Sequence, residues 1–342
     1  MPSLLEALKL AKERGAAQQS GQSPTPGGTA GITGQIFNIQ QQAQPKQPVS
    51  PYSLNSDIVS KILDTITDIP TLPTIATKVM DSINNTDATA KDVADIIKND
   101  QALTAKILQV SNSAYYAGYS QCTTVQNAIA RLGLLQIKRM VLSISIFETF
   151  NKYQNTIFNL KDFWTHSIAV AHASKIIGKL SNFSDSDDLF TAGLLHDIGK
   201  LITIKYLPEM FEEIIKKMQS YPPDTAYFDI EKNEFPVNHC DIGSWLSIKW
   251  KMSREIQSVI FNHHLPPITS TIFDKNLIMF SAIVYIADKL VKKLELGFSG
   301  DKNCLIDQEI LNYVLKGKTT AEKICEELTK CKNIIEATTA VA

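Results

Sequence analysis

Long apolar runs and paired cysteines are both missing from this chain of 342 residues. No apolar run reaches the roughly 18 residues that a bilayer-spanning helix needs, and Glu6 and Lys9 interrupt the apolar N-terminus, which therefore does not resemble a signal peptide. The five cysteines are odd in number and form no C-x-x-C pair, which argues against a disulfide framework and against a cysteine-rich zinc site. These absences predict a cytoplasmic protein with no membrane span.

An excess of either charge is missing as well. The chain carries 34 basic and 35 acidic residues, so its formal net charge is −1. A domain that wraps nucleic acid would show a strong basic excess. Arg131, Lys138 and Arg139 could share one helical face, but a solvated or interdomain surface is the simpler interpretation. Nucleic acid is therefore not an expected partner.

Strand patterns are also absent, because no segment alternates apolar and polar residues between turn signals. Apolar residues instead recur at helical spacing from about residue 52 onward, which predicts an all-α fold. Thr89 and Asp92 resemble a capping box that starts one helix, and Gly133 resembles the C-cap of another. Residues 134–150 are apolar almost throughout and predict a long buried helix.

The second half of the chain continues the helical pattern. Asp162 stands where an N-cap is expected for a helix that runs to about residue 180. Residues 185–200 and 276–296 predict two further helices. Thr319 and Glu322 form a capping box for the last helix.

Two segments are expected to lack regular structure. Residues 17–50 are rich in Gln, Gly, Pro, Ser and Thr, with Lys46 as their only charge, which is typical of a flexible linker. Residues 221–236 contain three prolines and predict an irregular loop that packs down in part. Residues 4–11 have helical apolar spacing, which fits either a short amphipathic helix that docks on a partner or on the domain itself, or a frayed terminus.

The histidines carry most of the chemical information. His196 and Asp197 are adjacent in the run G-L-L-H-D-I-G-K, which ends at Lys200. This pair offers a nitrogen and an oxygen to one cation, a mixture that Mn, Fe and Zn accept, and Lys200 could supply positive charge to an anionic substrate. The other polar residues in or beside apolar helical stretches are His166, His239, His263, His264 and Asp288.

Each of these histidines taken alone is most simply a hydrogen-bonded residue of the core or the surface. Five of the six histidines nevertheless fall in this one constellation, and His172 is the exception. Unpaired polar groups in apolar surroundings are costly, so the five together suggest a shared site.

The order of these residues resembles the HD superfamily of metal-dependent phosphohydrolases, and their arrangement is similar to the binuclear metal pattern of its HD-GYP branch. The resemblance implies seven metal ligands, namely His166, His196, Asp197, His239, His263, His264 and Asp288. It further implies that Asp197 bridges two cations and that Lys200 contacts phosphate as a catalytic residue. After His264 the chain reads Leu265-Pro-Pro-Ile, whereas an HD-GYP protein would continue with Glu and a G-Y-P stretch, so hydrolysis of cyclic-di-GMP is not expected.

The first half of the chain resembles the HDOD domain, a bacterial signalling-output domain of the same superfamily. The resemblance extends over about residues 56–288 and is carried by residues 69–76 (IPTLPTIA), 96–108 (IIKNDQALTAKIL), 111–116 (SNSAYY) and 128–133 (AIARLG). The expected organisation is a short helix and linker (1–51), an N-terminal helical part of the HDOD domain (52–155), an HD-like metal-site subdomain (156–298) and a helical extension (299–342).

Two hypotheses of different classes follow from the resemblance. In the first, the chain is a regulatory module that binds a signalling protein partner or a nucleotide, with one or two divalent ions (Fe, Mn, Zn or Mg) per chain as a structural or sensing element. In the second, it is a metal-dependent phosphohydrolase acting on a nucleotide or cyclic nucleotide, with Asp197 and Lys200 in the catalytic roles. The HDOD resemblance favours the first hypothesis, and the complete ligand set favours the second.

Overall fold

The structure is a computed structural model, and it describes most of the chain from residue 70 onward. The described residues are 70–84, 89–113, 120–150, 158–183, 186–271 and 273–340, together with Glu6, Lys9, Leu63, Asp64, Ile66 and Tyr116. The predicted linker at 17–50 lies outside this part of the chain. Lys9 near the N-terminus pairs with Glu213, with 2.7 Å between Nζ and Oε2.

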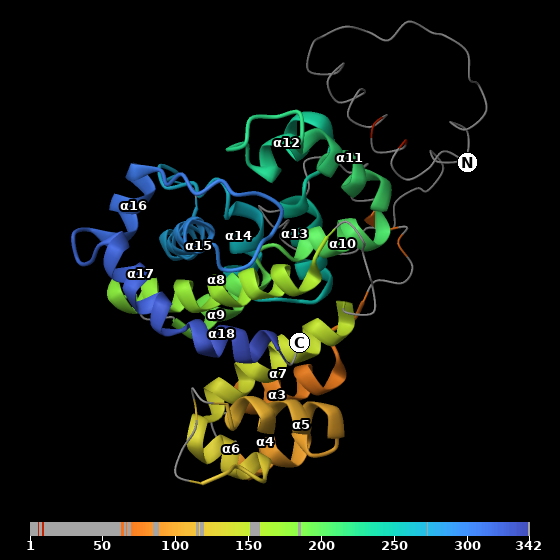
Figure 1. Cartoon of the computed structure of the whole chain (residues 1–342), viewed down its shortest axis with the longest axis vertical. Coiled ribbons are helices and arrows are strands. Elements are labelled where there is room, and N and C mark those ends of the chain that lie inside the picture. Colours follow the sequence, from red (N-terminus) through yellow and green to blue (C-terminus); the bar gives the residue numbers. More distant parts are fainter. Residues whose placement is uncertain are drawn as a thin grey trace, which may run out of the picture.

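The first group of helices lies at the bottom of Figure 1 and extends upward along α7. It consists of α3 (Thr74–Asn84), α4 (Ala90–Ile97), α5 (Gln101–Ser111), α6 (Val125–Leu132) and α7 (Leu134–Phe150). The capping box predicted at Thr89 and Asp92 starts α4, and Gly133 is the C-cap of α6 as predicted. Gly133 has a φ of 82°, a conformation that glycine adopts at little cost, and it lets α7 begin immediately after α6.

The second group of helices occupies the larger part of the molecule. It consists of α8 (Leu160–Leu180), α9 (Ser186–Leu195), α10 (Ile198–Tyr206), α11 (Pro208–Met218), α12 (Tyr227–Glu234), α13 (His239–Lys249), α14 (Arg254–Asn262), α15 (Lys275–Lys293), α16 (Gln308–Leu315), α17 (Ala321–Lys330) and α18 (Lys332–Thr339). No strand occurs among the residues that the structure describes, so the all-α prediction is confirmed. None of the described helices is long and apolar enough to cross a membrane.

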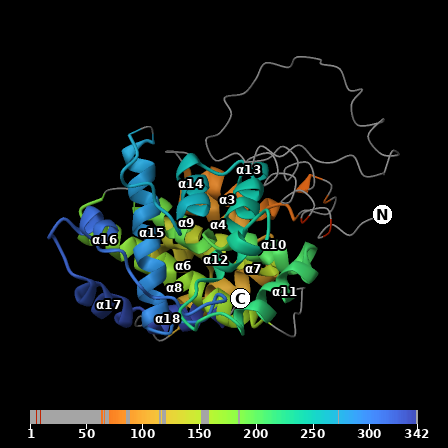
Figure 2. The same ribbon diagram turned by 90° about the horizontal axis from the view of Figure 1, so that it is seen from above.

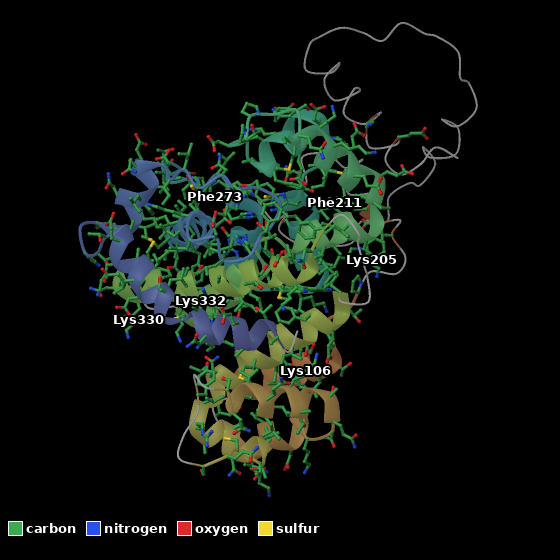
Figure 3. The ribbon with its side chains drawn as sticks, in the orientation of Figure 1. Lys106, Lys205, Phe211, Phe273, Lys330 and Lys332 are labelled. Carbon is green, nitrogen blue, oxygen red and sulfur yellow. The ribbon has the colours of Figure 1, made fainter. Side chains whose placement is uncertain are left out.

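Helix α7 belongs to two hydrophobic cores. Its residues Ile137 and Ile144 pack into the core of the first group, whereas Phe147 and Phe150 pack into the core of the second group. A helix that is apolar on all sides needs neighbours on all sides, which accounts for the apolar pattern of residues 134–150. An ion pair of Glu148 with Lys106 ties α7 to α5, with 3.2 Å between Oε1 and Nζ. Figure 3 labels Lys106 on α5.

Six helices of the second group surround one buried region. Helix α8 packs against α9 and α15, α14 packs against α9, α13 and α15, and α10 packs against α13. Figure 2 shows α13, α14 and α15 standing next to one another, seen from above. The residues of the predicted metal site lie on these helices or at their ends.

Several predicted element boundaries differ from the structure. The helix predicted over 185–200 is broken at His196 and Asp197, which form a turn between α9 and α10. The segment predicted as an irregular loop contains α12, because its three prolines lie before and after this helix rather than inside it. The prolines therefore delimit α12 without interrupting it.

Two predicted helix caps are displaced from their expected positions. The N-cap of α8 is Asn159, whose side chain accepts hydrogen bonds from the backbone N–H groups of Lys161 and Asp162, so Asp162 lies in the first turn instead. The N-cap of α17 is Thr320, one residue after the predicted Thr319. In both cases a neighbouring residue with equal capping ability takes the position.

Candidate metal centre

Eight predicted site residues lie around the buried region, on the helices that surround it or at their ends. His166 lies in the middle of α8, His196 and Asp197 form the turn between α9 and α10, Lys200 lies in α10, His239 begins α13, His263 and His264 follow the end of α14, and Asp288 lies in α15. All are buried except His264, which is partly exposed. The fold thus brings together side chains from segments that span more than 120 residues of sequence.

The first half of the centre is formed by two histidines and two aspartates. His166 Nε2 lies 3.0 Å from Asp288 Oδ1, and His196 Nε2 lies 3.8 Å from the same oxygen. His196 Nε2 also lies 3.3 Å from Asp197 Oδ2, while its Nδ1 faces the carbonyl oxygen of Gly193 at 2.8 Å. The bond to Gly193 places the His196 proton on Nδ1, so that Nε2 presents a lone pair to the centre.

The second half of the centre is formed by three histidines around the other oxygen of Asp197. His239 Nε2 lies 3.0 Å from His264 Nε2 and 3.4 Å from His263 Nε2. Asp197 Oδ1 lies 3.2 Å from His239 Nε2 and 3.5 Å from His263 Nε2. The two oxygens of Asp197 therefore face the two halves of the centre separately.

Hydrogen bonding fixes which nitrogen of each histidine points inward. His239 Nδ1 bonds Glu231 Oε2, and His263 Nδ1 bonds the carbonyl oxygen of Ile260 at 3.1 Å. Because both Nδ1 atoms face acceptors, they carry the proton, and both Nε2 atoms present lone pairs. These lone pairs converge with Asp197 Oδ1, so three acceptors face one another across 3.2–3.5 Å. Only a cation between them, a proton or a metal ion, makes this arrangement favourable.

Buried polar atoms without a hydrogen bond lie in both halves of the centre, most of them in the first. Among the described residues, none donates to or accepts from His166 Nδ1, His166 Nε2, His196 Nε2, Asp197 Oδ1 or Asp288 Oδ1 in hydrogen-bond geometry. Leaving such atoms unsatisfied is costly inside a protein. Together with the convergent lone pairs, they show that this nitrogen and oxygen donor set fits a divalent metal ion.

Electrostatics keep Asp197, Asp288 and His263 in the protonation states that metal binding requires, whereas the pKa of His239 is raised, because Cys240 and Glu231 outweigh its burial. Burial would raise the pKa of Asp197, but His196 and Lys200 hold it well below its usual value. Burial would likewise raise the pKa of Asp288, but Lys292 and His166 hold it well below. Burial lowers the pKa of His263 to about 4, so its imidazole is neutral at pH 7. Charged carboxylates and neutral imidazoles are the forms that bind metal ions.

Two lysine ammonium groups lie buried beside the centre, and acceptor groups of the chain already bond to both. Lys200 Nζ donates to Asp197 Oδ2 at 2.8 Å and to the carbonyl oxygen of Ser299 at 2.9 Å. Lys292 Nζ lies 3.0 Å from Asp288 Oδ2 and 3.0 Å from Asp301 Oδ1. The loop that follows α15 therefore supplies one acceptor to each ammonium group.

Sequence reasoning missed four residues that contact the centre. Glu231 is fully buried and accepts hydrogen bonds from both the backbone N–H and the Nδ1 of His239. Cys240 places its Sγ 3.6 Å from His239 Nε2. Lys292 and Asp301 hold the side of the centre near Asp288. Glu231 lies in the segment predicted as a loop, and the neighbouring apolar residues at helical spacing were the signal that could have revealed α12.

Comparison with known proteins identifies the family of the chain. The HDOD domain family model matches residues 69–266. An uncharacterized protein from Treponema pallidum (strain Nichols) is 27% identical over 237 residues, which is 64% of this chain and 44% of that longer protein, so the chain spans less than half of its relative.

Solved structures share the fold. The chain is similar to an HDOD domain protein from Geobacter sulfurreducens, with a TM-score of 0.68 and 24% identity over 82% of this chain and 95% of that one. It is also similar to a candidate phosphohydrolase from Shewanella amazonensis SB2B, with a TM-score of 0.65 and 22% identity over 85% and 100% of the two chains. At these identities the likeness concerns the fold alone. The family match spans more than half of the chain, and the chain belongs to the HDOD domain family.

Proposed function

We propose that this chain is a regulatory module of the HDOD type, built around a divalent metal centre and binding a signalling partner. The metal would be held by His166, His196, Asp197, His239, His263, His264 and Asp288. A bound divalent ion would supply Lewis-acid stabilisation to negative charge on a phosphoryl oxygen or on a ligand. The unpartnered buried donors and the convergent lone pairs support the metal part of this proposal.

The occupied lysines are the observation that carries the regulatory interpretation. A phosphohydrolase needs a cationic side chain free to bind the phosphate of its substrate. Lys200 here already donates to Asp197 and to Ser299, and the ring of Tyr227 lies 5.0 Å from its Nζ. Lys292 is likewise held between Asp288 and Asp301. A phosphate would have to compete with Ser299 for Lys200 and with Asp301 for Lys292.

The partly exposed side of the centre, at His264, also supports the regulatory interpretation. His264 is the donor that reaches the surface, and Phe228 of α12 stacks on its ring with 4.6 Å between centroids and 17° between planes. Phe228 therefore covers the partly exposed edge of the centre. The exposed Leu265 follows directly, where an HD-GYP protein would carry its substrate-recognition stretch.

A metal-dependent phosphohydrolase acting on a nucleotide or cyclic nucleotide is the second candidate, and the complete donor set favours it. In that case Asp197 would hold the metal together with the histidines, and Lys200, once released from Ser299, would donate to a phosphate oxygen. This role requires the hydrogen bond from Lys200 to Ser299 to break, so it predicts a measurable difference between the bonded and released states of Lys200.

Metal analysis followed by turnover assays separates the two candidates. The full chain, purified without chelators, should contain one or two transition-metal ions, and the double variant His196→Ala with Asp197→Ala should contain fewer. His172→Ala is the matched control, because His172 lies outside the centre and its loss should leave the metal content unchanged. Metal-loaded wild type that turns over no member of a phosphodiester and nucleotide panel supports the regulatory module. Turnover that the double variant abolishes supports the phosphohydrolase, and metal-free wild type refutes both.

A further inference from the structure

Cys240 lies among the three histidines of the second half, in a position that no sequence pattern indicated. Its side chain is buried, with 2% exposure, and its Sγ lies 3.6 Å from His239 Nε2 and 3.9 Å from His263 Nδ1. Donor atoms of His239, Cys240, His263 and His264 all lie within 4.8 Å of one another. Cys240 is a free thiol and takes part in no disulfide.

The separations of the other donors from His239 Nε2 match those of a tetrahedral site. Zinc–nitrogen bonds of about 2.05 Å and zinc–sulfur bonds of about 2.3 Å place two nitrogens about 3.3 Å apart and a nitrogen and a sulfur about 3.6 Å apart. The observed separations from His239 Nε2 are 3.4 Å to His263 Nε2, 3.0 Å to His264 Nε2 and 3.6 Å to Cys240 Sγ. The sulfur is therefore already at ligand distance from the histidine that begins α13.

Independent observations show that this half needs a cation. The lone pairs of His239 Nε2 and His263 Nε2 face each other, because the Nδ1 atoms of both rings are engaged by Glu231 and by the carbonyl oxygen of Ile260. Asp197 Oδ1 faces the same space, and no described residue donates a hydrogen bond to it. The thiol of Cys240 thus adds a third kind of donor atom, sulfur, to a space where nitrogen and oxygen acceptors already converge.

We propose that Cys240 is a sulfur ligand to the ion held by His239, His263 and His264. This inference rests on the proposed metal centre and makes its two halves chemically different. A thiolate with three imidazoles selects borderline-soft ions such as Zn²⁺, Fe²⁺ or Co²⁺ over Mg²⁺, whereas the half with His166 and Asp288 has only nitrogen and oxygen donors. On binding, the ion takes the sulfur lone pair and the thiol proton leaves to solvent.

Cobalt substitution tests the inference in the full chain. The protein is stripped of metal with a chelator, reloaded with Co²⁺ and measured by absorption spectroscopy. The wild type should show both the weak visible bands of bound Co²⁺ and an intense near-ultraviolet sulfur-to-cobalt charge-transfer band. Cys240→Ser should lose the near-ultraviolet band and keep visible bands. Cys304→Ser is the matched control, because Cys304 lies in the loop beyond α15, and it should keep both.

The outcomes separate this inference from the metal centre itself. Visible bands without a charge-transfer band in the wild type would overturn the sulfur ligand and leave the metal centre standing. The absence of all cobalt bands would overturn the proposed centre and the inference with it. Should Cys240→Ser fail to fold, a zinc-edge X-ray absorption spectrum of the wild type replaces it. A sulfur shell at about 2.3 Å supports the inference, and nitrogen and oxygen shells alone refute it.

Discussion

Gly199 offers the sharpest test of how the fold sets the metal centre. This glycine lies in α10, two residues after Asp197, and its Cα faces the start of α13. A Cβ at this position would overlap the carbonyl oxygen of His239 and would lie 2.7 Å from the backbone nitrogen of Gly243 and 2.8 Å from the carbonyl carbon of His239. Ordinary contact begins at 3.4 Å, so Gly199→Ala requires α13 to retreat by at least about 0.7 Å.

The size of the effect follows from what the new methyl group meets. Overpacking typically costs about 1–3 kcal/mol, and here the obstructing atoms are backbone atoms that cannot rotate away, so we expect a loss of about 3 kcal/mol or more in the free energy of unfolding. The retreat also moves His239, whose Nε2 lies 3.2 Å from Asp197 Oδ1. Metal–ligand distances tolerate about 0.2 Å, so metal affinity should fall at least about tenfold.

Denaturant unfolding of the metal-free protein and metal titration of the native protein measure the two effects separately. Gly178→Ala is the matched control, because its Cβ would overlap the end of the Leu189 side chain, away from the centre. This control should lose stability while it keeps metal affinity. A Gly199→Ala protein with wild-type stability and wild-type affinity would refute the proposed role of the α10–α13 contact.

Three further predictions test other parts of the molecule. Glu231→Gln replaces the carboxylate that orients His239 and should weaken metal affinity by about 10–100-fold. The control Glu234→Gln, three residues later on α12, should leave metal affinity unchanged. Competition with a chromogenic chelator measures the affinity of both variants. The pKa of His172, lowered by burial to about 3, is below its unfolded value of about 6.5, so this residue contributes stability that is complete above pH 6.5 and is lost as the pH falls toward 3. Between pH 6.5 and 4.5 this linkage corresponds to about 2.7 kcal/mol in the free energy of unfolding, and to about 1–2 kcal/mol once the partial exposure of the ring is taken into account. Urea unfolding at the two pH values should therefore show a loss of stability that is smaller in His172→Gln. An equal loss in the variant contradicts this account. Deleting residues 1–51 should change the free energy of unfolding by less than about 1 kcal/mol, since Lys9 contacts the domain through a partly exposed ion pair with Glu213 and through the ring of Phe235; a larger loss in calorimetry would show that the segment packs on the core.

The fold could be predicted where local signals are sufficient. The capping box at Thr89 and the C-cap at Gly133 are read directly from residue types, and the apolar stretch 134–150 indicates a helix with neighbours on all sides. The caps at Asn159 and Thr320 were missed by a few residues, because several adjacent residues cap equally well and the path of the incoming chain selects among them.

The break between α9 and α10 could not be predicted from local sequence. Apolar residues continue at helical spacing on both sides of His196, and no proline or glycine precedes it within two residues. What fixes the turn is the close approach of Gly199 to the backbone of α13, a contact with residues about forty positions later in the chain. The turn is also what directs His196 and Asp197 toward the centre, so a tertiary contact decides the local structure at this point.

The donor set was recognisable from the order of its residues, but the groups that support it were not. No motif or spacing marks Glu231 or Cys240 in the sequence. Asp301 accepts a hydrogen bond from the backbone N–H of Tyr227, 74 residues earlier, which holds it beside the centre. Such pairings arise from packing between distant segments, so no spacing rule reveals them. The domain boundaries at residues 51, 155 and 298 stay predictions.

Charge balance gives a reason why this buried centre needs an ion. The acidic and basic side chains that contact the donors or one another at the centre are four carboxyl and two amino groups, namely Asp197, Asp288, Asp301, Glu231, Lys200 and Lys292. With neutral histidines, four negative and two positive charges leave a net charge of −2 in a region where an unbalanced charge is costly. Protonated histidines can supply part of the compensation when no metal is bound, since Glu231 and Cys240 outweigh burial and raise the pKa of His239. A single divalent ion supplies all of it, and a second ion would bring an excess that a Cys240 thiolate partly offsets. The same residues that recruit a metal therefore also limit how much positive charge the centre accepts.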